Sequence, residues 1–179
     1  MEADWEFEIG AGAPVIEAYW NGFVDLRSEP KRISALSECL GLPGLAESLL
    51  QLNGAASPVW TSKSDVFTPE HIDPDEMDAS IEESAYAIAC YIDVLLRSDQ
   101  IWNHAIRAER DCKRLCARLR EVVLRRCRID VVIRKAVMAD LNSLGATIYF
   151  TACGPTIAES KTRLGECLRA FTSAVALLR

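Results

Sequence analysis

The alternation of hydrophobic and polar residues predicts a chain that mixes strands and helices. Residues 4–9 alternate without a break, which indicates a half-buried strand with one acidic face. The same period of two predicts further strands over residues 59–67, 86–95, 127–134 and 145–153. These are the strands that we expect the sheet to contain.

Apolar residues at helical spacing occupy the segments between these strands. Residues 101–124 and 156–178 repeat apolar positions every three or four residues, which is typical of amphipathic helices. Two shorter helices are predicted over residues 30–40 and 43–52, because each starts near a proline and stops before a glycine.

The order of the predicted elements indicates the fold class. After the strand at 86–95 come a helix, two strands and a helix, which is a split βαβ arrangement without its last strand. We expect residues 59–67 to supply the missing strand, antiparallel to residues 86–95. The predicted fold is α+β, with an antiparallel sheet of about five strands, a ferredoxin-like C-terminal part and helices packed on one face.

Length and composition favour one domain. The chain has 179 residues, of which 50% are hydrophobic, so it can bury a substantial core. We expect a single domain over residues 1–179, in which an N-terminal strand and short helices (1–56) precede the ferredoxin-like core (57–179).

The cysteines and the apolar stretches indicate the cellular compartment of the protein. Seven cysteines are an odd number, and several occupy apolar positions where free thiols pack as small hydrophobes. That usage is typical of a reducing compartment. The apolar stretches are too short to cross a membrane, and the first ten residues are acidic rather than a secretion signal. We expect a cytoplasmic protein with no membrane partner.

Charge is distributed very unevenly along the chain. Residues 1–89 carry a formal charge of −13 and residues 90–179 carry +7. Residues 107–135 alone hold eleven Lys/Arg against four Asp/Glu. Such a segment could bind the phosphates of a nucleic acid. However, it lacks the aromatic residues typical of proteins that bind single strands, and the acidic half of the chain would repel a polyanion. We therefore expect the basic segment to face carboxylates of the same chain or of a second copy, in preference to a nucleic acid.

Two patterns resemble metal sites, and each has a structural alternative. The loop over residues 68–78 crowds carboxylates around His71, but it departs from the EF-hand spacing at Met77. Its acids also fit the start of a short helix. Cys112 and Cys116 lie four residues apart, yet both fall on the apolar face of a predicted helix. We expect no metal and no cofactor.

The turn between the strand at 145–153 and the last helix is a candidate anion or small-ligand site. Backbone N–H groups at a helix start can bind an anion, and a cysteine there can have a lowered pKa and act as a nucleophile. Cys153, Gly154 and Thr156 are the residues concerned, with Cys153 as a weak catalytic candidate. No histidine is placed by the sequence as its base, and a cap formed by Thr156 and Glu159 explains the same residues.

The polar face of the predicted sheet is a second candidate ligand surface. If the strands pair as predicted, their polar positions converge on the face away from the helices, where they would bind a small ligand or a partner, or form ordinary cross-strand pairs. The residues concerned are Asp93, Arg128, Asp130, Arg134, Thr147, Tyr149 and Thr151.

The sequence contains no constellation of nucleophile and base and no metal-ligand set. Our first hypothesis is a non-enzymatic protein-interaction module that regulates or neutralises a protein partner, expected to form a homodimer. The alternatives are a small-molecule or anion-binding domain, with cysteine-dependent catalysis at Cys153–Thr156, and nucleic-acid binding through residues 107–135.

Overall fold

The computed structural model describes residues 1–97, 102, 104–139 and 141–177. Two expected helices extend beyond these limits, to residues 101 and 178, which lie outside the described part. The strands are β1 (Glu2–Phe7), β2 (Val15–Glu17), β3 (Val59–Phe67), β4 (Tyr86–Leu96), β5 (Cys127–Met138) and β6 (Leu141–Gly154). The helices are α1 (Pro43–Asn53), α2 (Ala105–Arg120) and α3 (Ile157–Ala176), with short 3-10 turns η1 (Pro30–Ala35), η2 (Ser37–Cys39), η3 (Asp75–Met77) and η4 (Glu82–Ser84).

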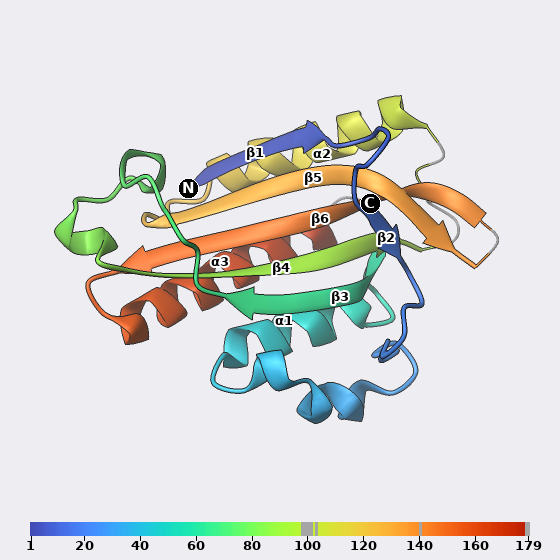
Figure 1. Ribbon diagram of the computed structural model, residues 1–179, viewed down its shortest axis with the longest axis horizontal. Coiled ribbons are helices and arrows are strands. Elements are labelled where there is room, and N and C mark those ends of the chain that lie inside the picture. The colour runs from blue at the N-terminus through green and yellow to red at the C-terminus, as the bar shows by residue number, and fades with distance from the viewer. Residues whose placement is uncertain (98–101, 103, 140, 178–179) are drawn as a thin grey trace.

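The fold is α+β, built on a sheet with the strand order β1-β5-β6-β4-β3, and β2 also pairs with β5 (Figure 1). The pairs β3–β4, β4–β6 and β5–β6 are antiparallel, whereas β1 and β2 run parallel to β5. The prediction of an antiparallel sheet of about five strands is therefore wrong in its strand direction: the sheet is mixed, with six strands among the described residues. The parallel pairs arise because the N-terminal segment follows the outer edge of β5 in the same direction, in two pieces.

In the described part of the chain, three α-helices pack on one face of the sheet: α2 and α3 lie behind it in Figure 1, and α1 lies below β3, in contact with β3 and α3. Alternate residues of the central strands point to that face and form the main core with the helices, for example Phe150 of β6 edge-on to Phe171 of α3 at 5.1 Å. Helices α1 and α3 approach closely at two glycines, because a Cβ on Gly44 would lie 2.7 Å from the Cα of Gly165. Among the described residues no helix combines the length and the apolar character needed to span a bilayer.

The other face of the sheet, hereafter the open face, is crossed by the N-terminal segment, and the loop after β3 passes over its left end, where Glu76 pairs with Arg128 at 2.7 Å (Figure 1). After β2 the chain leaves the edge at β5 and crosses to β3, where the Ser62 hydroxyl donates to the carbonyl of Ala18 at 2.9 Å. We call residues 14–23 the crossing segment. Its Ile16 packs on Gly145 of β6, where a Cβ would lie 3.1 Å from the Ile16 Cδ1. A small second core forms beneath it from Ile16, Ala18, Trp60, Leu95 and Ala136.

Ion pairs connect the acidic first half of the chain to the basic second half. Arg120 Nη2 lies 3.5 Å from Asp4 Oδ1 of β1, and Arg125 Nε lies 2.8 Å from Asp78 Oδ2. Arg128 and Arg134 of β5 pair in the same way, with the carboxylates of Glu76 and Glu8. The basic segment over residues 107–135 therefore faces carboxylates of its own chain at these points, as its charge pattern predicts.

Candidate functional site

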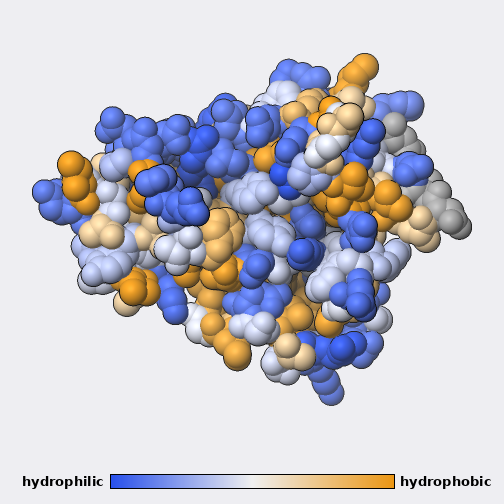
Figure 2. All heavy atoms as spheres, in the orientation of Figure 1, coloured by the Kyte–Doolittle hydropathy of each residue, from blue (hydrophilic) through white to orange (hydrophobic). Residues whose placement is uncertain are grey.

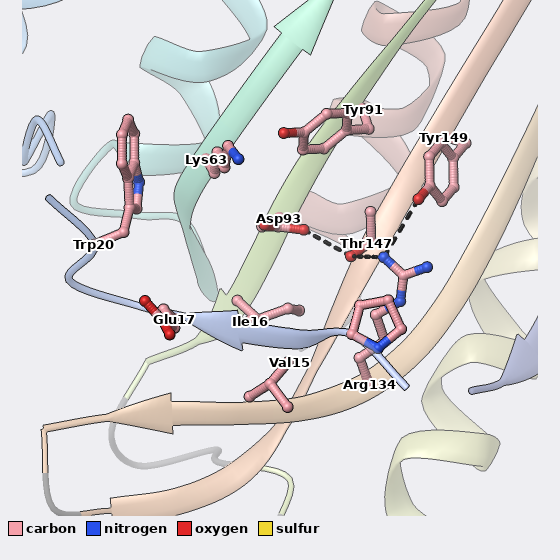
Figure 3. A pocket seen from close by; sticks show the side chains of 11 residues that line it. Val15, Ile16, Glu17, Trp20, Lys63, Tyr91, Asp93, Arg134, Thr147 and Tyr149 are labelled. Carbon is pink, nitrogen blue, oxygen red and sulfur yellow. Dashed lines mark hydrogen bonds between the residues drawn. The ribbon is translucent and has the colours of Figure 1, made fainter. Parts of the chain in front are cut away.

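A pocket of about 450 Å³ lies on the open face beneath the crossing segment (Figure 3). Its floor is formed by the outward-facing residues of β4, β5 and β6, and its sides by the crossing segment and β3. The lining residues that carry polar or aromatic groups are Glu17, Trp20, Lys63, Tyr91, Asp93, Arg134, Thr147 and Tyr149.

A continuous chain of hydrogen bonds crosses the pocket floor. Arg134 Nε donates to Glu8 Oε2 at 2.9 Å, and Arg134 Nη1 donates to the hydroxyls of Thr147 at 3.0 Å and Tyr149 at 3.3 Å. The buried Thr147 hydroxyl in turn donates to Asp93 Oδ1 at 2.6 Å. The threonine therefore links a guanidinium to a carboxylate by accepting from one and donating to the other (Figure 3).

Asp93 is the least satisfied charged group of this chain of contacts. Burial raises the pKa of Asp93 above its usual value, and this outweighs the hydrogen bond from Thr147 and the positive charges of Arg134 and Lys63, which lower it. At the pocket mouth Lys63 is exposed, and its Nζ lies 5.7 Å from the Trp20 ring centroid. The Tyr91 hydroxyl beside it raises the pKa of Lys63, so this side chain stays cationic at neutral pH.

Three further candidates from the sheet lie on the same face but outside this pocket. The Arg128 guanidinium donates to the Asp130 carboxylate at 2.9 Å, and the cross-strand partner of Arg128 on β6 is Thr151. Arg128 and Asp130 border a second hollow of about 320 Å³, together with Asp4 and Glu6 of β1. The strand register places Arg128, Asp130 and Thr151 on the face of Asp93 and Thr147; Arg128 and Asp130 border the second hollow, and Thr151 lines neither hollow.

The turn at Cys153–Thr156 lies at the far end of β6, and its groups are already engaged. Burial raises the pKa of the Cys153 thiol, which is the opposite of what a nucleophilic cysteine needs. Gly154 pairs with Tyr86 at the end of the β4–β6 ladder. The Thr156 hydroxyl accepts from the backbone N–H of Glu159 at 3.2 Å, so the chain itself caps α3. These contacts give no support to catalysis at this turn.

The residues of the two sequence patterns that resemble metal sites make structural contacts in the fold. In the loop over residues 68–78, Asp73 accepts from the N–H of Asp75, while Glu76 pairs with Arg128. Cys112 and Cys116 belong to α2 and are buried on the side of that helix that faces the core. Among the residues that the structure describes, no group of three or more histidines, cysteines or carboxylates is arranged to hold a metal ion.

Sequence reasoning did not find half of the pocket. Glu8 and Glu17 come from the N-terminal segment, and Lys63 comes from a β-bulge in β3, where the pairing register shifts between Thr61 and Ser64. Trp20 is one of several aromatic residues in the N-terminal part of the sequence, and no local pattern marks it as a pocket residue. Tyr91 was not among the predicted site residues either, although the alternation in β4 places it on the face of Asp93 and is the signal that could have found it.

Comparison with known proteins adds no assignment: no family model, no curated protein and no solved structure matches this chain.

Proposed function

We propose that this chain is a non-enzymatic protein-interaction module that binds a positively charged partner protein on its open face. The observation that carries the proposal is the excess of carboxylates on that face. By strand register, by contact with the residues so placed, or by a place in the pocket lining, its acids are Glu2, Asp4, Glu6, Glu8, Glu17, Asp65, Glu76, Asp93 and Asp130, against the cations Lys63, Arg120, Arg128 and Arg134.

The shape of the open face also supports this proposal. The helices cover the other face, so the strands present a broad surface with two neighbouring hollows. Figure 2 views this surface, on which hydrophilic side chains gather at the upper left, over β1, the start of β5 and the loop between β3 and β4, beside a paler central region. Complementary charge steers a partner to such a surface and fixes its orientation. Aromatic side chains in a pocket, here Trp20, Tyr91 and Tyr149, are the usual surroundings of an interface anchor.

The test is a titration of the isotopically labelled chain, followed by nuclear magnetic resonance, with a short peptide of alternating arginine and glycine. We expect shifts of amide signals on β1, β4, β5 and β6, and affinity that falls with added salt. The double variant Glu2→Gln/Glu6→Gln on the open face should weaken binding several-fold. The matched double variant Glu47→Gln/Glu166→Gln removes the same charge from the helical layer and should leave affinity unchanged. Equal effects of the two, or no binding at low salt, would refute the proposal.

We also infer that the part of the chain after residue 57 is related in arrangement to ferredoxin-like domains. In its support, β6 lies between β4 and β5 and is antiparallel to both, α2 connects β4 to β5, and β3 lies on the outer side of β4. The homodimer stays a prediction. A second copy is one partner with the required charge, because the exposed side of α2 carries Arg107, Arg110 and Arg114.

A further inference from the structure

The carboxylate on the floor of the main pocket has unused acceptor capacity. An ionised carboxylate offers about four lone-pair sites. Within the described part of the chain, Asp93 accepts one side-chain hydrogen bond, from the Thr147 hydroxyl. Burial removes part of the water that would otherwise fill the other sites. A donor group entering the pocket would therefore find a partly desolvated acceptor.

The two cations that border the pocket do not supply that donor. Arg134 is committed to other groups, since Nε and Nη2 donate to Glu8 and Nη1 donates to Thr147 and Tyr149. Lys63 is exposed at the mouth, beside the rings of Trp20 and Tyr91. In the arrangement seen here, neither side chain donates to Asp93.

The aromatic rings of the pocket suit a flat cation. The ring centroids of Tyr91 and Tyr149 lie 6.1 Å apart, on either side of the β4–β6 ladder. The guanidinium of Arg134 already lies over the Tyr149 ring, with its Cζ 5.7 Å from the centroid. A guanidinium can stack on such rings while its N–H fork meets a carboxylate, which a compact ammonium does less well. Glu17 of the crossing segment adds a second carboxylate to the lining.

We infer that the pocket beneath the crossing segment binds an arginine side chain of the partner, with its guanidinium hydrogen-bonded to Asp93. This inference rests on the proposed function and deepens it, because it assigns the anchor by which a basic partner is held on the open face. The volume of about 450 Å³ lies in the range of pockets that enclose a small organic group. The carboxylates around it would orient the rest of the partner.

The first test uses N-acetyl-arginine methylamide and its citrulline analogue, which has nearly the same shape but carries no charge. We expect the arginine probe to shift the amide signals of Thr147 and Tyr149, and the citrulline probe to bind at least about tenfold more weakly, as the loss of a charged hydrogen bond implies. This comparison uses the unmodified chain, so it does not depend on the folding of any variant. Equal binding of the two probes would overturn the inference and indicate a pocket for neutral ligands.

The second test uses Asp93→Asn, with Asp65→Asn as the matched control. Both substitutions remove one charge from the open face, but Asp65 lies outside the lining of this pocket. Asp93→Asn should weaken the arginine probe roughly 10- to 100-fold and remove its advantage over citrulline, whereas Asp65→Asn should change it less than about threefold. If Asp93→Asn left the probe affinity unchanged while the arginine–glycine peptide still bound the open face, the anchor would be wrong and the proposed function would stand. Failure of that peptide to bind the unmodified chain would instead remove the proposed function.

Discussion

Replacing Thr147 by valine tests whether the hydrogen-bonded chain on the pocket floor holds the open face together. The substitution keeps the shape of a side chain that is 1% exposed and removes the hydroxyl between Arg134 and Asp93. Losing one hydrogen bond to a charged group costs about 1.5–3 kcal/mol. Arg134 and Asp93 are only partly buried, so water will replace part of both bonds, and we expect a loss of about 2 kcal/mol in the free energy of unfolding. For a chain of this length the melting temperature should fall by roughly 4–8 °C.

The pH dependence of this loss is a stricter test than its size. The hydrogen bond from Thr147 lowers the pKa of Asp93, so without it the folded-state pKa of Asp93 rises further above the unfolded value. A raised carboxyl pKa costs stability at neutral pH and costs none once the group is protonated in both states. Urea unfolding should therefore show a larger loss at pH 7 than at pH 4. The control is Thr151→Val, on the same strand and face, whose hydroxyl makes no hydrogen bond within the described part of the chain. A cost at Thr147 no larger than at Thr151, or one independent of pH, would refute the reasoning.

Three further predictions address the helix contact, the turn cysteine and the assembly. Gly44→Ala should lower the free energy of unfolding by about 1–3 kcal/mol, because its Cβ would collide with the Gly165 backbone. Gly165→Ala meets only ordinary contacts and should stabilise the chain by up to about 1 kcal/mol. Thermal melts of the two variants test both expectations. Iodoacetamide should label Cys153 in the folded chain no faster than the half-buried Cys39, as mass spectrometry of digests would show, and rapid selective labelling would reopen the catalytic alternative. Sedimentation equilibrium should show a dimer that weakens with salt if a second copy occupies the open face, and a strict monomer would leave that face to a different protein.

Segments with a long, regular pattern were predicted well from the sequence. The strand expected over residues 59–67 matches β3, and the helix expected over residues 43–52 matches α1 to within one residue. The predictions fell short where pairing, rather than pattern, decides the structure. β6 begins at Leu141 instead of residue 145, because its first residues continue the ladder with the end of β5 through Lys135–Leu144 and Ala136–Ser143. Residues 142–144 do not alternate clearly, and only the partner strand makes them extended.

The candidate site was found in part for a related reason. Strand alternation, together with the predicted pairing, places Asp93, Thr147 and Tyr149 on one face, since neighbouring residues in paired strands point to the same side. No local pattern reveals the crossing segment. β2 is three residues long, too short to show a period, and it is extended because its backbone pairs with β5. The pocket exists because the chain then crosses to β3. This path is held by tertiary contacts, namely the hydrogen bond from the Ser62 hydroxyl and the packing of Ile16 on Gly145.

The uneven charge of the chain takes on a specific meaning in this fold. Pairing β1 with β5 places a run of alternating acids beside the arginines of β5 and α2, so part of the opposite charge is consumed inside the molecule. Exposed pairs of this kind add little stability, so the energy of folding does not require so many carboxylates. Glu2 and Glu6 have no cationic partner among the described residues, and both belong to the open face. That surplus is what a folded chain would keep if the open face had to attract a basic surface, and it is the feature that the paired glutamate variants remove.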